Sequence, residues 1–228
     1  MSRPLVILGT GGSACDVLDV VEAINFQGLE PAWEVVGFLD DAEAAGSRRL
    51  GFAVLGSLRE AGKYAGHTFV NAIGSEKSFR RLPEILGATG LAAARFATLV
   101  HPRASVSSRA RLGSGVIVNH GSSIGGGARI GDFVTLCPGS IVGHDASIED
   151  YTVVAPGAIV SGFVRVGRGC YLGAGAMIRQ HLEVGAGALV GMGAVVVRGV
   201  EAETVLVGNP ARFLECGPEA RISTESEK

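Results

Sequence analysis

The sequence predicts two structural classes in one chain of 228 residues, a small parallel α/β unit followed by a parallel β-helix. Two observations lead to this prediction: strand-like and helix-like segments alternate in residues 1–95, and an aliphatic residue then recurs at every sixth position. Composition agrees, because 47% of the residues are hydrophobic and 35 are glycine, about twice the usual share. Such a chain can bury a core and contains many tight turns.

The first part of the chain has the pattern of alternating strands and helices. Residues 5–8 are a short apolar strand, and the glycine-rich segment 9–14 follows it. Residues 15–25 place their apolar side chains on one side of a helix, and residues 35–39 and 69–73 are two further strands. Strands that alternate with helices indicate a parallel sheet.

The glycine-rich segment lies where a Rossmann-like unit holds a phosphate at the N-terminus of a helix. The candidate substrate-binding residues in it are Gly9, Gly11, Gly12 and Ser13. Asp40, which ends the second strand, lies where an acidic residue would meet a ribose. The third glycine of a GxGxxG motif is replaced by Ala14, so a tight turn without a ligand is an equal alternative from this pattern alone. A dinucleotide coenzyme is disfavoured, because nothing later in the chain offers a redox site.

An uninterrupted repeat of six residues decides the fold of the second part. The repeated aliphatic residues are Val106, Leu112, Val118, Ile124, Ile130, Leu136, Val142, Ile148, Val154, Val160, Val166, Leu172, Ile178, Val184, Val190 and Val196. A period of six fits neither a helix nor a simple strand. It fits a triangular β-helix with about 18 residues per coil and coils about 4.8 Å apart. Glycine often follows the aliphatic residue, and we expect it to supply the positive φ of the corners.

Charge and hydropathy exclude several classes of partner. The formal net charge is −2 and no long basic run occurs, so nucleic acid is not an expected partner. No run of 18 apolar residues is present, so we expect no membrane insertion. The N-terminus lacks a secretory pattern, and the four cysteines show no pairing or metal-binding spacing, so a cytoplasmic protein with reduced thiols is expected.

The combination of both parts resembles one family along nearly the full chain. The segments that resemble it are VILGTGGSACDVLDVVEAIN, VVGFLDD, FVNAIGS, ATLVHPRASVS, the hexapeptides with VGHDASIED, and VLVGNPARFL. This is the bacterial sugar acetyltransferase family that includes the PglD enzymes of protein glycosylation, nucleotide-sugar N-acetyltransferases and NeuD-type sialic acid O-acetyltransferases.

The resemblance implies a Rossmann-like domain over residues 1–95 that binds the nucleotide sugar, and a left-handed β-helix over residues 96–214 that binds acetyl-CoA. The polar tail, residues 215–228, is expected to be disordered. By the same resemblance the protein is a homotrimer that uses acetyl-CoA as cosubstrate and no metal. Its acceptor is a nucleotide-linked amino sugar, such as a 4-amino-4,6-dideoxyhexose, made for a surface glycan or glycoprotein.

The resemblance also assigns site residues. The catalytic His-Asp pair of the family matches His144 and Asp145, and the acidic pair near the nucleotide sugar matches Asp40 and Asp41. Two positions depart from the family: many members have histidine at Ser13, and some have a second histidine at the position of Val153. Sugar recognition therefore differs in detail.

We expect His144 to act as general base on the attacking amine, with Asp145 orienting the imidazole. The amine attacks the thioester directly, and a backbone N–H near Gly162 is a candidate oxyanion donor. Neither Cys137 nor Cys170 stacks in the column of His144, so both are poor nucleophiles. The candidate acetyl-CoA contacts are Gly162, Gly173, Ala174 and Gly191, with Arg198 and Arg212 as candidates for its phosphates. The alternative for each of these glycines is a corner that needs only its φ.

Other functions stay open at this point. O-acetylation of a sugar hydroxyl needs the same base, so His144 does not distinguish it from N-acetylation. A non-catalytic β-helix that only binds a sugar nucleotide is disfavoured by the His-Asp pair. A metal site is disfavoured because His120 and His144 fall on different corners of the predicted prism. His120 stacks below Pro138 and Pro156, which favours a structural role over one in substrate or subunit contact.

Overall fold

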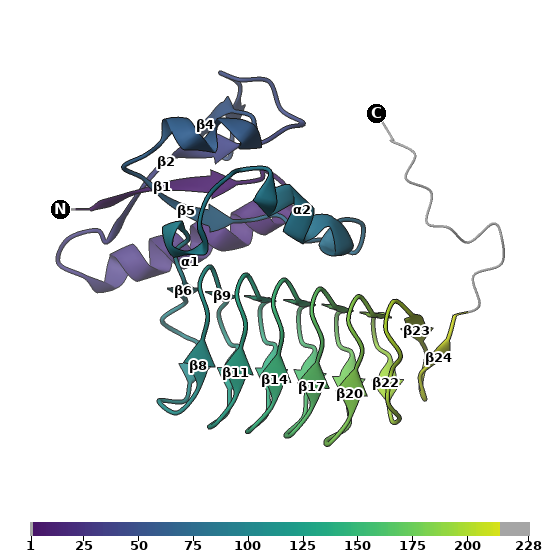
Figure 1. Ribbon diagram of the computed structural model, residues 1–228. Coiled ribbons are helices and arrows are strands. Elements are labelled where there is room, and N and C mark those ends of the chain that lie inside the picture. The colour runs from purple at the N-terminus through teal and green to yellow at the C-terminus, as the bar shows by residue number, and fades with distance from the viewer. Residues whose placement is uncertain (1, 215–228) are drawn as a thin grey trace.

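The computed structural model describes residues 2–214, and the predicted tail, residues 215–228, lies outside the described residues. Figure 1 shows two parts: an α/β unit formed by the first part of the chain and a long β-helix formed by the rest. Both parts were predicted, and they lie side by side along one face of the β-helix. Among the described residues, no helix is long and apolar enough to cross a bilayer.

The α/β unit contains one five-stranded sheet with the order β3-β4-β2-β1-β5. Its elements are β1 (Arg3–Leu8), α1 (Gly12–Gln27), β2 (Trp33–Leu39), β3 (Arg48–Arg49), β4 (Phe52–Gly56), β5 (Thr68–Asn71) and α2 (Leu82–Gly87), with 3₁₀ turns at Leu58–Lys63, Phe79–Arg81 and Ala93–Arg95. Strands β2 and β5 pair with β1 on opposite sides, and both are parallel to it. Strands are therefore added first on one side of β1 and then on the other, which leaves a crevice at the carboxyl ends of β1 and β5.

The β-helix has three faces, which the chain visits in turn. The apolar face contains β7 (Ser105–Val106), β10 (Ser123–Ile124), β13 (Ile141–Val142), β16 (Ile159–Val160), β19 (Met177–Ile178) and β22 (Val195–Val196). The polar face contains β8 (Arg111–Leu112), β11 (Arg129–Ile130), β14 (Ser147–Ile148), β17 (Arg165–Val166) and β20 (Glu183–Val184). The covered face contains β6 (Leu99–Val100), β9 (Ile117–Val118), β12 (Thr135–Leu136), β15 (Val153–Val154), β18 (Tyr171–Leu172), β21 (Leu189–Val190), β23 (Val205–Val207) and the antiparallel β24 (Arg212–Phe213).

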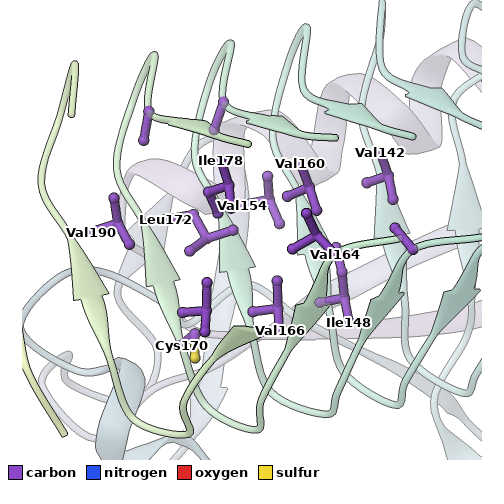
Figure 2. Close-up of a cluster of buried hydrophobic side chains, with 14 of the residues drawn as sticks. Val142, Ile148, Val154, Val160, Val164, Val166, Cys170, Leu172, Ile178 and Val190 are labelled. Atoms are coloured by element: carbon purple, nitrogen blue, oxygen red, sulfur yellow. The ribbon is translucent and has the colours of Figure 1, made fainter. Parts of the chain in front are cut away.

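The core of the β-helix is built from the predicted aliphatic residues. Paired strands on one face are offset by 18 residues, as with Leu136 and Val154, and both of these side chains are completely buried. Figure 2 shows the aliphatic side chains pointing into the prism from all three faces, with Cys170 among them. Each coil thus repeats the contacts of the one before it, which is why a strict period of six suffices to specify the fold.

The corner glycines differ from the prediction. The glycines that directly follow the aliphatic residues do not have positive φ. They are required because coils approach closely: a Cβ on Gly173 would lie 2.6 Å from the amide nitrogen of Met192. The left-handed conformation occurs two residues later instead. There the chain has glycine at nine positions of the series but also five larger residues, Phe133, Asp145, Tyr151, Phe163 and His181.

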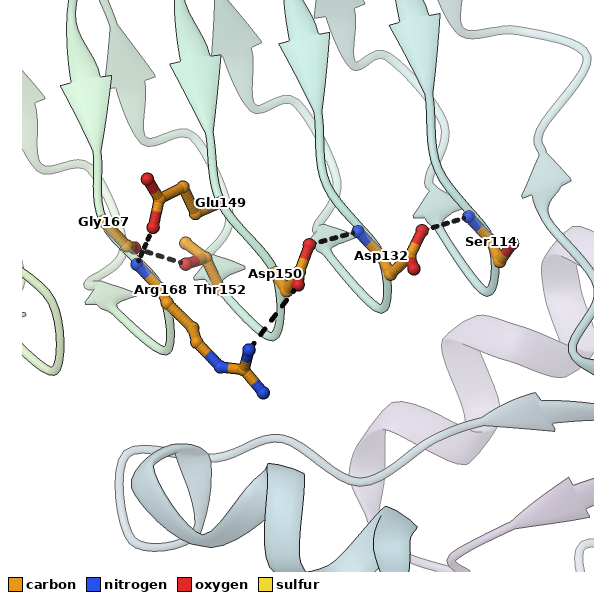
Figure 3. A network of polar contacts seen from close by, with 7 residues as sticks. All are labelled: Ser114, Asp132, Glu149, Asp150, Thr152, Gly167 and Arg168. Atoms are coloured by element: carbon orange, nitrogen blue, oxygen red, sulfur yellow. Dashed lines mark hydrogen bonds and ion pairs between the residues drawn. The ribbon is translucent and has the colours of Figure 1, made fainter. Parts of the chain in front are cut away.

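Polar side chains bridge successive coils at the corner between the polar and covered faces. The Asp132 carboxylate accepts a hydrogen bond from the Ser114 amide, and Asp150 accepts one from the Asp132 amide, each at 2.8 Å. Figure 3 shows this ladder continuing to the Arg168 guanidinium, 3.8 Å from Asp150. The carboxylates satisfy backbone donors that the turn leaves without partners.

The α/β unit packs against the covered face. Phe79 lies against Tyr171 with ring centroids 5.7 Å apart, and the Arg80 guanidinium donates to the carbonyl of Gly187 at 3.0 Å. Val153, on the same face, is only 2% exposed. The apolar and polar faces are left open, and the corner between them is the one opposite the α/β unit.

Candidate active site

His144 and Asp145 lie at the corner where the chain passes from the apolar to the polar face, which we call the His144 corner. The Nδ1 atom of His144 lies 3.0 Å from the Oδ2 atom of Asp145. Their side chains are 64% and 50% exposed. A carboxylate at Nδ1 favours the tautomer with its proton there, which leaves Nε2 free to accept a proton from a substrate. The pair has the geometry of a general base with an orienting group.

Neighbouring coils fix the position of the His144 ring. A Cβ on Gly162 would lie 2.8 Å from Nε2 and 3.0 Å from Cε1, so the ring lies directly over this glycine. On the coil below, the Arg109 guanidinium occupies the corresponding space over Gly126. The two glycines therefore make room for side chains of an adjacent coil.

A groove of about 470 Å³ lies beside the pair on the polar face. The His144 ring contacts Phe163 edge to face, with centroids 5.0 Å apart, and Phe163 stacks on His181 at 4.8 Å. Arg129 and Arg165 line the same groove. His181 is exposed, and no sequence pattern indicates that it stacks on Phe163.

The predicted substrate-binding residues of the α/β unit do come together. Gly9, Gly11, Gly12, Ser13, Asp40 and Asp41 line one cavity of about 400 Å³ at the carboxyl ends of β1 and β5. Asp40 Oδ2 accepts hydrogen bonds from the Thr10 amide and hydroxyl, at 2.8 and 2.7 Å, and Asp41 accepts one from the Leu58 amide at 2.9 Å. Both carboxylates therefore also hold the loops that shape the cavity.

The N-terminus of α1 opens into this cavity. Its N-cap is Gly11, no side chain caps the first turn, and the first turn contains no acidic residue. Free N–H groups at a helix N-terminus attract anions such as phosphate. The cavity also contains Ser75, Ser78 and Arg81, which the sequence analysis missed. The position of Ser75 just after the third strand is the one signal that could have found them.

The two departures from the family pattern lie beside the α/β unit and away from the His144 corner. Ser13 and Cys137 line a narrow space between α1 and the covered face. Val153 is buried on that face, and a Cβ on Gly74 would lie 3.1 Å from it. Neither position contacts His144 in the same chain.

The candidate acetyl-CoA residues are divided between two corners. Gly162 lies at the His144 corner, whereas Gly173, Ala174 and Gly191 lie where the chain passes from the covered to the apolar face. We call this the His120 corner. Gly173 is buried and Ala174 is exposed. Gly162, Gly173 and Gly191 do not have positive φ. The alternative that each is a corner glycine needed only for its φ is therefore wrong. Arg198 and Arg212 are both exposed.

The cysteines considered as nucleophiles are in apolar surroundings. Burial raises the pKa of Cys137 to about 12 and that of Cys170 to about 11. Both thiols therefore stay protonated near neutral pH, where a nucleophile needs the thiolate. In residues 2–214, no group of three or more His, Cys, Asp or Glu side chains is arranged to hold a metal ion.

Comparison with known proteins agrees with this arrangement. Residues 4–83 match the PglD N-terminal domain, and residues 127–162 match the bacterial transferase hexapeptide family of six repeats. A search of curated proteins finds no match.

Several solved structures are similar over nearly the whole chain. The acetyltransferase domain of PglB from Neisseria gonorrhoeae is 30% identical, with a TM-score of 0.80, and the alignment covers 93% of this chain and 100% of that domain. The same domain has been solved with acetyl coenzyme A. PerB from Caulobacter crescentus, solved with CoA and GDP-perosamine, is 29% identical with a TM-score of 0.79, over 92% and 97% of the two chains. WeeI from Acinetobacter baumannii is 28% identical with a TM-score of 0.78, over 93% and 100%.

The α/β unit, the repeats and this full-length similarity agree with one another. The chain, an acyltransferase with a left-handed β-helix, belongs to the PglD/NeuD-type family of sugar acetyltransferases.

Proposed function

We propose that this protein transfers the acetyl group of acetyl-CoA to the amino group of a nucleotide-linked amino-deoxysugar, in the synthesis of a surface glycan or glycoprotein. The observation that supports this most is the exposed pair of His144 and Asp145, 3.0 Å apart. It occurs in a chain 29% identical to PerB, which was solved with CoA and GDP-perosamine. A 4-amino-4,6-dideoxyhexose is the acceptor class that we favour.

In this proposal His144 takes the proton of the attacking amine at Nε2. Asp145 holds the proton on Nδ1 and stabilises the imidazolium that forms, since an anion 3.0 Å away favours the charged ring. Acetyl-CoA supplies an activated thioester. The protonated state of Cys137 and Cys170 supports direct transfer without an acyl-enzyme. The ring of His144 lies over Gly162, and the backbone N–H of this glycine is our candidate oxyanion donor.

The open apolar face supports the proposed homotrimer. The outward-facing side chains of this face form a row of paired residues on successive strands: Ile141, Ile159, Met177 and Val195. Ile141 and Met177 are 41% and 47% exposed. The equivalent row of the covered face is buried by the α/β unit, as Ile117 and Val153 show. An exposed apolar row of this kind marks a protein interface. We place it toward the threefold axis, with the His144 corner of one copy beside the His120 corner of the next.

That arrangement assembles the site from two copies. Within one chain, the His144 corner points away from the α/β unit, so the cavity at Asp40 and Asp41 cannot serve the same chain's His144. In the trimer, Gly162 of one copy faces Ala174 and Gly191 of its neighbour, and acetyl-CoA lies in the cleft between them. The nucleotide sugar binds in the neighbour's α/β cavity, with its diphosphate at the N-terminus of α1.

A substrate panel tests the proposal. Purified protein is given acetyl-CoA with UDP-, dTDP- and GDP-linked 4-amino-4,6-dideoxyhexoses, the matching 4-hydroxy sugars, and sialic acid, and release of the CoA thiol is measured. We expect release with an amino sugar and none with its hydroxyl analogue. Release with hydroxyl acceptors alone would replace the proposal by sugar O-acetylation, and failure to bind acetyl-CoA by calorimetry would favour a non-catalytic binding protein.

A further inference from the structure

Two groups of opposite charge have no ion-pair partner among residues 2–214. Arg109, Arg111 and Arg129 are exposed near the His144 corner, on the first two coils. Asp19 and Glu22 are exposed on α1, beside the His120 corner. Within residues 2–214, none of these five side chains forms an ion pair, although seven other pairs are present. Neither group is therefore neutralised by an ion pair within these residues.

The acidic group borders a groove of about 600 Å³ between α1 and the first coils, which we call the α1 groove. Its other wall contains Arg103 and the rings of His101 and His120, 5.7 Å apart. His101 is 9% exposed. Burial and then the neighbouring Asp19 carboxylate raise the pKa of Asp16, one turn earlier on α1.

The two groups lie at similar heights on either side of the apolar face: α1 lies by the covered face, and the arginines lie at the His144 corner and on the polar face. Helix α1 contacts β6, on the first coil, and its N-terminal turn reaches Cys137, two coils further along. Arg111 and Arg129 pair in register on the first two coils, and Arg109 reaches over Gly126 beside them. A threefold ring needs a heterologous interface, in which one patch of each copy meets a different patch of the next.

We propose that the α1 groove docks the arginine group of the neighbouring copy, so that Asp19 and Glu22 pair with Arg109, Arg111 and Arg129 across the subunit boundary. This inference rests on the homotrimer proposed above and names the contact that sets its register. Charge complementarity of this kind fixes orientation and suppresses wrong pairings.

The contact has a consequence for the active site. Helix α1 begins at Gly12, directly after the loop of the nucleotide-sugar cavity. Arg109 packs over Gly126, one coil below His144. Docking α1 on the arginine group therefore brings the cavity of one copy to the level of the neighbour's His144. The same residues that hold the copies together align acceptor and base.

Charge reversal tests the contact directly. One variant carries Asp19→Arg and Glu22→Arg, a second carries Arg109→Glu and Arg129→Glu, and a third carries all four substitutions. Sedimentation across a concentration series gives the trimer association constant of each. We expect each double variant to lose at least about a hundredfold in association, because like charges then face each other. The fourfold variant restores opposite charges everywhere except at Arg111, so it should recover at least about tenfold of the lost association.

The control is Arg59→Glu, an exposed arginine of the α/β unit far from this contact, which should leave association unchanged. Circular dichroism confirms that each variant is folded. A trimeric parent whose double variants associate normally, or whose fourfold variant stays dissociated, overturns the α1 contact and leaves the proposed reaction intact. A parent that is monomeric at every concentration overturns the homotrimer as well.

Discussion

The His144 and His120 corners contain histidine at the same place in the hexapeptide, yet their surroundings differ. His144 has Asp145 as its next residue, with φ +58°, and the carboxylate turns back to Nδ1. His120 is followed by Gly121, with φ +69°, and has no carboxylate there. Both corners need a left-handed residue, but only one uses an acidic side chain that tolerates this conformation.

The imidazoles of the two corners also differ in what they contact. The His120 ring contacts the ring of His101 edge to face, with centroids 5.7 Å apart. The Nδ1 atom of His101 accepts a hydrogen bond from the Arg103 amide at 2.9 Å. Burial, and then the neighbouring charges of His120 and Arg103, lower the pKa of His101. The His144 ring instead lies over Gly162, and its Nε2 is the ring atom nearest to that glycine. Equal positions in a repeat thus provide a structural histidine at one corner and a candidate base at the other.

Replacing each histidine by alanine should give the largest difference between the corners. His144→Ala removes the base and should lower kcat about 10²- to 10⁴-fold. His120→Ala should lower it less than about threefold, since no carboxylate orients that ring for proton transfer. Steady-state kinetics on the responsive acceptor measure both. Equal losses in the two variants, or a trimeric His144→Ala with near-parental turnover, would contradict the assignment.

Gly162→Ala should break the geometry of the His144 corner without unfolding it. The new Cβ would lie 2.8 Å from Nε2, and the exposed ring can rotate away at little cost. Because a shift of about 1 Å can cost about a hundredfold in rate, we expect a loss of about 10- to 100-fold. The matched control is Gly199→Ala, where the nearest atom is 3.8 Å from the Cβ. A thermal midpoint close to the parent's separates displacement of the base from loss of fold.

The sequence predicted the β-helix well because its contacts repeat. The offset of 18 residues between stacked positions, such as Leu136 and Val154, follows from the period alone. The crevice with Asp40 was also predicted, since strand ends and a glycine loop are local signals. By contrast, β3 (Arg48–Arg49) and α2 (Leu82–Gly87) were not, because such short elements depend on tertiary packing.

The details of the His144 corner could not be predicted. The offset of 18 residues per coil places Gly126 below His144 and Gly162 above it, but it does not show which side chains cover the two glycines. Arg109 covers Gly126, and the imidazole of His144 covers Gly162. Both contacts depend on the direction of a side chain, which the period does not specify. The stack of Phe163 on His181 likewise joins two left-handed residues on successive coils. Large residues are uncommon at positions with positive φ, so backbone preferences would have predicted glycine at both positions.

Asp145→Asn sharpens the comparison, because it makes the His144 corner resemble the His120 corner while retaining a residue that accepts positive φ. The side chains of His144 and Asp145 are 64% and 50% exposed. Water therefore screens the attraction between them, and the pair contributes little to the stability of the protein. We expect kcat to fall about fivefold with KM for acetyl-CoA unchanged, because the imidazolium loses its stabilising anion. Stopped assays across a pH series measure the effect. An unchanged kcat at every pH would show that Asp145 does not orient the base.

The smallest effect is expected at Cys137, which lies between the α/β unit and the covered face. Burial raises its pKa to about 12, so at pH 7–9 the thiol stays protonated. Cys137→Ser should therefore change kcat less than about twofold, as expected for a site without an acyl-enzyme. Incubation with acetyl-CoA alone, followed by intact-mass analysis, should show no added acetyl group. Loss of turnover in a folded trimer, together with an acetylated parent, would move the chemistry from the His144 base to a covalent route.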